Sequence, residues 1–145
     1  MKKLLIGLLL LAACSSRTTE LPATRAAGVT GARPALDAFL SAIRAKDLQA
    51  LGAVWGDKNG AIRDSKRISR DELEKRELVL MCYFNHDSYK VLNEAPGQDG
   101  ERVMTVSLTR GTLTRTTDFF LTSGSERWYV RTANMDPVRD LCSKK

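Results

Sequence analysis

The stretch AFLSAIRAKDLQALGAVWG, residues 38–56, carries most of two consecutive amphipathic segments. Apolar residues recur at helical spacing within it and just before it, first as Leu36, Phe39, Leu40 and Ile43 and then as Leu48, Leu51, Val54 and Trp55. Arg33-Pro34 can begin the first helix, because proline is tolerated in the first helical turn. Asp47 lies between the two stripes, and its side chain can cap a second helix. The stretch therefore predicts two short helices in succession.

A third helix is predicted from Ser69 to about Asn85. Ser69 and Glu72 have the spacing of a capping box, in which each side chain accepts a hydrogen bond from the other residue's backbone N–H. Beyond this helix the apolar residues alternate instead, over residues 88–93, 102–109, 113–121 and 127–133. Such alternation predicts an antiparallel sheet of about four strands, with one face on the core and the other in water.

Helices followed by strands predict an α+β domain over residues 33–145, with three N-terminal helices packed on a curved antiparallel sheet. At residues 38–56 the chain resembles the NTF2-like superfamily (the cystatin-like α+β cone), because two opening helices meet at a small-residue–Asp step and end at an aromatic residue. Residues 61–67 depart from the pattern, since they leave little room for strands that many members place before the third helix. The resemblance implies a pocket between helices and sheet, and a function as an isomerase, a dehydratase or a non-catalytic binding module.

The first fourteen residues, MKKLLIGLLLLAAC, resemble a bacterial lipoprotein signal ending in the lipobox Leu11-Ala12-Ala13-Cys14. Two lysines precede an apolar run that is too short to span the hydrocarbon core of a bilayer. The resemblance implies that residues 1–13 are a signal peptide and that Cys14 carries the lipid. The alternative is an ordinary secretory signal with a cysteine near the cleavage point by chance.

The residues after the lipobox bear on location. Ser15 follows Cys14 as in lipoproteins sorted to the outer membrane, so we expect a lipid-anchored envelope protein on the outer membrane, facing the periplasm. Residues 14–32 are small, polar and non-periodic, which predicts a flexible tether behind the lipidated N-terminus. The first predicted partner is thus the membrane itself, through the lipid anchor.

The same interpretation predicts how the remaining cysteines pair. With Cys14 lipidated, Cys82 and Cys142 remain as a pair in an oxidising compartment, which predicts a disulfide between them. The alternative is two buried thiols. A metal site is not expected, because the two cysteines are far apart and His86 is the only histidine.

Charge argues against a nucleic-acid partner. The whole chain carries a net charge of +6, and loss of two lysines with the signal leaves +4, spread along the chain rather than clustered. Arginines at the strand positions 110, 115, 127 and 131 could form a basic stripe that meets an anionic glycan, lipid headgroups or an acidic protein. The alternative is an ordinary solvated strand face.

Catalytic residues and cofactors are not predicted. The first helix lacks a tyrosine, and His86 and Asp87 are adjacent in an extended segment, so their side chains should point to opposite faces. We expect His86 in a surface turn. The sequence also lacks a glycine-rich phosphate loop, a Cys-x-x-Cys pair and a nucleophile elbow.

The predicted function is binding or assembly. Four aromatic residues, Phe39, Trp55, Phe119 and Trp128, could line a cavity, although aromatic residues at such spacing also serve as core. We expect a non-enzymatic domain whose partner is a small apolar ligand or another envelope protein. The alternatives are a small pocket enzyme of isomerase or dehydratase type, and a structural lipoprotein that forms homodimers through its open sheet face.

Overall fold

The computed structural model describes residues 27–143. Its helical part comprises α1 (Ala32–Ala45), α2 (Leu48–Val54) and α3 (Arg70–Tyr83), with a short hairpin, β1 (Gly56–Asp57) and β2 (Gly60–Ala61), and a 3-10 turn, η1 (Ile62–Asp64), between α2 and α3. The sheet follows as β3 (Ser88–Pro96), β4 (Arg102–Arg110), β5 (Leu113–Gly124) and β6 (Arg127–Ala133), with a 3-10 turn, η2 (Gln98–Gly100), before β4. A last 3-10 segment, η3 (Asp136–Leu141), ends the described chain.

The first two helices follow the predicted pattern. The apolar stripe of α1 is buried, and Lys46 ends the helix in a left-handed conformation with φ 55°. Asp47 caps α2 as expected, because its Oδ1 accepts a hydrogen bond from the backbone N–H of Ala50 at 2.9 Å. The tight step between the helices lets both bury their apolar faces in one core.

The third helix differs from the prediction in two ways. Ser69 accepts a hydrogen bond from the Glu72 N–H at 3.3 Å, but the Glu72 carboxylate pairs with Arg76 at 2.9 Å instead of completing the capping box. α3 also packs mainly on α2 and the C-terminal η3 rather than on the sheet, whereas α1 contacts β5 and β6 directly. Only part of the helical layer therefore covers the sheet.

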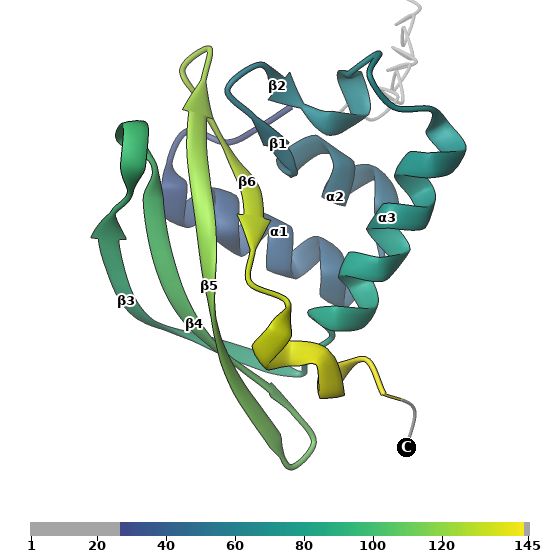
Figure 1. Cartoon of the computed structure of the whole chain (residues 1–145), viewed down its shortest axis with the longest axis vertical. Coiled ribbons are helices and arrows are strands. Elements are labelled where there is room, and N and C mark those ends of the chain that lie inside the picture. Colours follow the sequence, from purple (N-terminus) through teal and green to yellow (C-terminus); the bar gives the residue numbers. More distant parts are fainter. Residues whose placement is uncertain (1–26, 144–145) are drawn as a thin grey trace, which may run out of the picture.

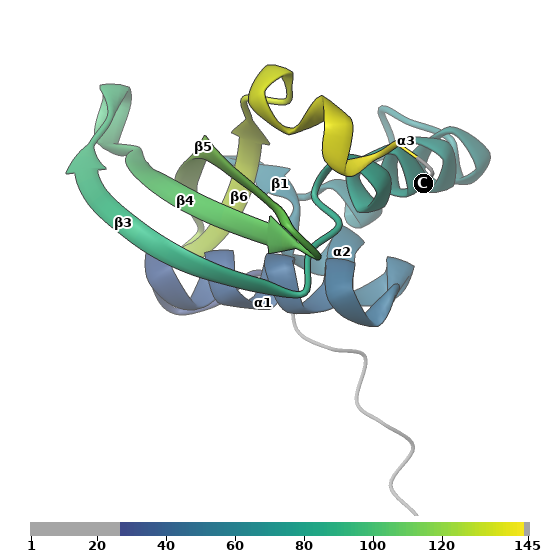
Figure 2. The same ribbon diagram turned by 90° about the horizontal axis from the view of Figure 1, so that it is seen from below.

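The four strands form one antiparallel sheet in the order β3-β4-β5-β6, which confirms the predicted α+β class and strand number. Met104, Val106 and Leu108 of β4 alternate into the core as expected. Register shifts interrupt β3 after Val91 and β5 after Phe120. Such irregularities increase the bend of a strand, and the sheet curves over α1 (Figures 1 and 2).

A two-stranded hairpin lies where only a turn was expected. Gly56 pairs with Ala61 and Asp57 with Gly60, so β1 and β2 are two residues each. A side chain at position 56 would meet the Gly60 carbonyl oxygen at 2.3 Å, so the hairpin closes because residue 56 is glycine. The hairpin comes just before residues 61–67, of which only Ala61 belongs to a strand.

The domain includes residues that were assigned to the tether. Val29 exchanges two backbone hydrogen bonds with Trp128 of β6, at 3.1 and 2.7 Å, and Gly28 donates its N–H to the Ala53 carbonyl at 2.7 Å. The domain thus begins before Arg33. Cys14, the predicted signal and residues 14–26 of the predicted tether lie outside the described residues. Within residues 27–143, no helix has both the length and the apolar character needed to cross a membrane.

Three phenylalanines join the layers of the core. Phe39 of α1, Phe84 at the end of α3 and Phe119 of β5 are each at most 1% exposed. Their ring centroids lie 5.1–6.3 Å apart, and the two contacts of Phe39 have edge-to-face geometry. The cluster therefore links the first helix, the third helix and the sheet at one point.

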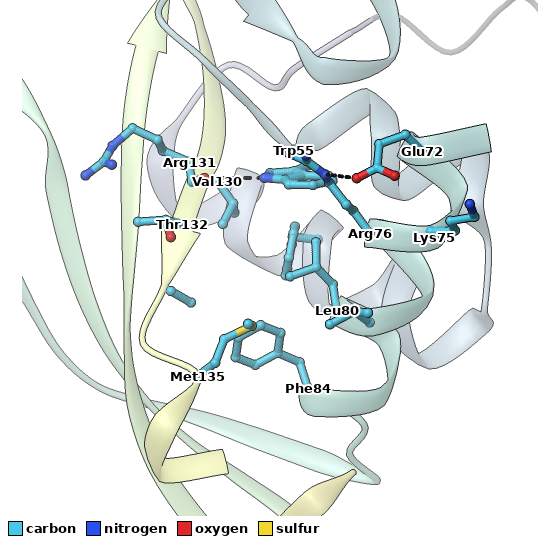
Figure 3. Close-up of a pocket in the computed structure, with 13 residues that line it drawn as sticks. Trp55, Glu72, Lys75, Arg76, Leu80, Phe84, Val130, Arg131, Thr132 and Met135 are labelled. Atoms are coloured by element: carbon cyan, nitrogen blue, oxygen red, sulfur yellow. Dashed lines mark hydrogen bonds and ion pairs between the residues drawn. The ribbon is translucent and has the colours of Figure 1, made fainter. Parts of the chain in front are cut away.

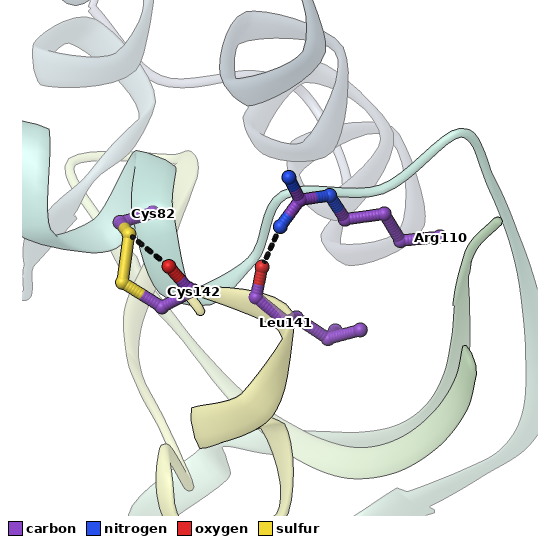
Figure 4. The surroundings of a disulfide bond; sticks show 4 residues. All are labelled: Cys82, Arg110, Leu141 and Cys142. Carbon is purple, nitrogen blue, oxygen red and sulfur yellow. Dashed lines mark hydrogen bonds between the residues drawn. A yellow bond between two sulfur atoms is a disulfide. The ribbon is translucent and has the colours of Figure 1, made fainter. Parts of the chain in front are cut away.

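Cys82 and Cys142 lie at disulfide distance, so the pairing expected from the cysteine count is present in the structure (Figure 4). The bond connects the last turn of α3 to the residue that follows η3, with 4.6 Å between the two Cα atoms. Arg110 donates to the Leu141 carbonyl beside it. The C-terminal segment is thus held to α3 by the disulfide and to β4 by this hydrogen bond.

Replacing both cysteines, Cys82→Ser with Cys142→Ser, should lower the free energy of unfolding. The sequence separation of 60 residues makes the loss about 4 kcal/mol if the disulfide acts by restricting the unfolded chain. Urea unfolding with and without a reductant measures it, and the reduced wild type should match the double variant. Equal midpoints for the oxidised wild type and the variant would contradict the prediction.

Candidate functional site

A cavity of about 420 Å³ opens between α3 and the end of β6 (Figure 3). One face of α3 forms one wall, with residues at helical spacing: Glu72, Lys75, Arg76, Val79 and Leu80. Residues 130–133 of β6 and Met135 form the opposite wall, and Phe39, Trp55 and Phe84 complete the lining. This volume lies in the range that holds a small organic ligand.

Trp55 closes one end of the cavity. Its backbone forms a parallel bridge with Val130, and its indole Nε1–H donates to the Arg131 carbonyl at 3.3 Å. Because the only polar atom of the indole is already hydrogen-bonded to β6, the rest of the ring offers apolar surface. Trp55 thus contributes apolar contact area without an unsatisfied donor.

The opposite end of the cavity is apolar and belongs partly to the C-terminal segment. Figure 3 places Phe84 and Met135 together there, with Leu80 between them and Trp55. Met135 directly precedes η3, which is anchored by the fully buried side chains of Val138 and Leu141. The position of this wall therefore depends on the segment that the disulfide holds.

The charged groups of the lining lie mostly on the α3 side. Glu72 and Arg76 form an ion pair at 2.9 Å, in which both side chains are about half exposed. The Arg131 side chain points away from the cavity (Figure 3), toward Glu101 and 5.9 Å from the centre of the Phe120 ring. Arg131 therefore contributes its backbone to the cavity rather than its charge.

The structure brings together two of the four aromatic residues predicted to line a cavity. Phe39 and Trp55 line it, whereas Phe119 is fully buried in the core and Trp128 pairs with Val29 outside it. The sequence did not predict that residues of α3 and Met135 would line the cavity. The spacing of Glu72, Arg76, Val79 and Leu80 could have indicated a shared face, but no sequence signal indicated Met135.

The expectation that His86 lies in a surface turn is wrong. The side chain is 2% exposed and packs edge-on against Tyr89. Its Nδ1 lies 2.8 Å from the Phe84 carbonyl, which can only accept, so Nδ1 carries the proton and Nε2 is left without a hydrogen-bond partner in residues 27–143. Burial lowers the pKa of His86, because it disfavours the charged form of the ring.

The side chains of Asp87 and His86 have different partners, as expected for adjacent residues in an extended segment. Asp87 is exposed and accepts a hydrogen bond from the Gly111 N–H at 2.7 Å. The two residues therefore do not converge as an acid/base pair, and neither lines the cavity between α3 and β6.

The four strand arginines are engaged with acceptors of the same chain. Arg110 donates to the Leu141 carbonyl, Arg115 to Asp140, Arg127 to the Ala27 and Gly28 carbonyls, and Arg131 to Glu101. The contacts of the first three hold the two ends of the described chain to the sheet, and that of Arg131 joins β6 to the turn before β4. The arginines have structural partners, which favours the ordinary alternative over a dedicated basic stripe.

No family model matches the chain, and the comparisons with curated proteins and with solved structures also gave no match. Among residues 27–143, His, Cys, Asp and Glu side chains do not gather in a group of three or more that could hold a metal ion. What the site can do is therefore argued from the cavity itself. Its apolar lining and one-sided charge suit a ligand that has an apolar body.

The face of α3 that packs on α2, away from the cavity, carries a buried carboxyl group. Glu77 is 3% exposed, and its Oε1 has no hydrogen-bond partner among the described residues. It fits against α2 because residue 52 is glycine, where a Cβ would lie 2.6 Å from that oxygen. Burial, and after it the charge of Glu74, raises the pKa of Glu77 to about 7.

Glu77 should make stability depend on pH. Its ordinary pKa is 4.5, so between pH 4.5 and about 7 the folded state keeps a proton that the unfolded state loses. The free energy of unfolding should therefore fall as pH rises through this window. Glu77→Gln should stabilise the protein by about 1–3 kcal/mol at pH 8, relative to wild type, and change little below pH 4.5.

Urea unfolding at several pH values between 4 and 8 measures the effect. Glu126→Gln, at an exposed turn position, is the matched control and should keep the wild-type pH profile. Parallel profiles for wild type and Glu77→Gln would contradict the prediction.

Proposed function

We propose that this chain is a lipid-anchored protein of the cell envelope whose α+β domain binds a small apolar ligand in the cavity between α3 and β6. The observation that carries the binding function is the cavity of about 420 Å³ with its largely apolar lining. A concave apolar site with few polar groups is the common form of a small-molecule site. The lipobox at Cys14 supports the anchor, and Ser15 supports an outer-membrane address facing the periplasm.

The domain is proposed to be an NTF2-like cone. The resemblance of residues 38–56 supports this, as do the curved sheet over α1 and the order of elements. A pocket between helices and sheet agrees with what the resemblance implies.

A binding role is proposed rather than catalysis. The titratable side chains that line the cavity are Glu72, Lys75, Arg76 and Arg131. Glu72 is paired with Arg76, and Arg131 is directed at Glu101 on the outside. These side chains are not arranged as a general acid or base beside a nucleophile, which supports binding over the pocket-enzyme alternative.

Binding of a neutral apolar probe, N-phenyl-1-naphthylamine, should depend on Val79 and not on its neighbour Leu78. Both side chains are exposed, at 46% and 57%, but only Val79 lines the cavity. Val79→Asp puts a short charged side chain into the apolar wall and should weaken probe binding about tenfold. Leu78→Asp is the matched control and should stay within about twofold of wild type.

The two tryptophans give an independent readout. In Trp128→Phe the remaining Trp55 lines the cavity, so its emission maximum should shift on binding, whereas in Trp55→Phe the emission maximum of the remaining Trp128 should not shift. Equal effects of the two aspartate variants, or no saturable probe binding, would contradict the proposed site.

Lipid attachment is tested in a bacterium that processes lipoproteins. Cys14→Ser should abolish labelling by palmitate and move the protein from the membrane to the soluble fraction, because the acyl chains supply the membrane affinity. Ser15→Ala keeps the cysteine and should remain labelled. Tight membrane attachment of Cys14→Ser would contradict the anchor.

A further inference from the structure

A second pocket, of about 430 Å³, lies between α2, η1 and α3. α2 and α3 pack against each other there (Figure 1), on the side of α3 that faces away from the cavity at β6. We call it the α2–α3 pocket. Its apolar lining is Leu48, Ile62, Ile68 and Leu73, and Glu77 lines it from α3. The α2–α3 pocket thus combines apolar surface with a carboxyl group.

The carboxyl group of Glu77 has no partner among residues 27–143. The side chain is 3% exposed, and Oε1 is enclosed without a hydrogen bond. That oxygen lies against Gly52, so Oε2 is the oxygen left for a group that enters from the pocket. Gly52 also weakens α2 relative to alanine, because glycine is a poor helix former. Two destabilising choices therefore meet at one point, which is typical of a functional site.

The other charged groups that line the α2–α3 pocket occur in pairs. On η1, Arg63 forms an ion pair with Asp64 at 3.3 Å, and on α3, Arg70 forms one with Glu74 at 3.2 Å. α2 adds no titratable side chain to the lining. Burial and the charge of Glu74 raise the pKa of Glu77, and neither arginine offsets them. An ionised Glu77 therefore leaves one negative charge in excess.

We propose that the α2–α3 pocket binds a small primary ammonium ion with a short apolar chain, whose N–H groups donate to Glu77 while the chain covers Ile62 and Ile68. The ammonium ion supplies what the ionised carboxylate lacks, positive charge and hydrogen-bond donors. A divalent metal ion fits less well, because it prefers several oxygen ligands and the described residues offer no group of three suitable side chains. This site does not depend on what the cavity at β6 binds.

Binding should depend on pH, because only the ionised carboxylate attracts a cation. The pKa of Glu77 is raised to about 7, whereas an alkylammonium ion loses its proton only near pH ~10. Affinity should therefore rise between pH 5 and 8, and binding below pH 7 should release a proton from Glu77. We expect binding to be about tenfold weaker at pH 5 than at pH 8, or weaker still.

Three six-carbon ligands test the charge: hexylammonium, hexanol and hexanoate. Each is titrated into the purified protein carrying ¹³C-labelled methyl groups, whose NMR shifts report both affinity and place. We expect hexylammonium to bind most tightly at pH 8 and hexanoate least. The methyl signals of Ile62 and Ile68 should move, whereas those of Ile43 in the core and Met135 at the other cavity should not.

Glu77→Gln should weaken hexylammonium binding about tenfold at pH 8 and remove its pH dependence, because the neutral amide attracts the cation less. The variant should fold, since it relieves the cost of a buried charge. Glu126→Gln, at an exposed turn position, is the matched control and should bind as the wild type does. Val79→Asp, which alters only the cavity at β6, should also leave hexylammonium binding unchanged.

Several outcomes would overturn the proposal. Equal affinities for the three ligands would show that charge plays no part. Unchanged binding in Glu77→Gln, or wild-type affinity that is the same at pH 5 and pH 8, would remove Glu77 from the site. Shifts at Met135 instead of Ile62 and Ile68 would move the ligand to the other cavity, and a failure of hexylammonium to bind would also overturn the proposal.

Discussion

The contact among Phe39, Phe84 and Phe119 is the constraint on which the rest of the domain depends. It is the point where the first helix, the end of the third helix and the sheet meet, and all three rings are excluded from water. Aromatic rings in such geometry combine a large buried area with a preferred orientation, so they set direction as well as distance. Truncating any one of them would open a hole at the junction of the layers.

The cavity is a consequence of how this cluster holds α3. Phe84 fixes only the end of the helix, and the disulfide from Cys82 adds a second attachment within the last turn. Earlier in the helix, Leu73 and Glu77 turn toward α2 rather than toward β6. The side of α3 that faces β6 therefore does not close fully onto the strand, and the space between them is the candidate site.

The sequence predicted the regular elements well because their periodicities are strong. The stripe of α1, the cap at Asp47 and the alternation of β4 each follow from local physical chemistry. The β1–β2 hairpin was not predicted, since two-residue strands are too short to show alternation. Of the four aromatic residues predicted to line a cavity, two line this one: Phe39 and Phe119 have the same residue type, and only tertiary packing puts Phe39 at the cavity and Phe119 away from it. His86 was misplaced for the same reason, because a helix-to-strand junction is usually exposed and here is covered.

The composition of α3 itself argues for a functional role. A helix that served packing alone would bury its apolar residues and expose its charged ones. α3 departs from this pattern at three positions: Leu78 and Val79 are exposed, while Glu77 is buried and its Oε1 has no hydrogen-bond partner within residues 27–143. Departures of this kind lower stability, and natural proteins retain them mainly where function requires them. The cavity lies along the side of this helix that carries Val79 and Leu80, so a ligand seated there would cover apolar surface that the domain leaves exposed.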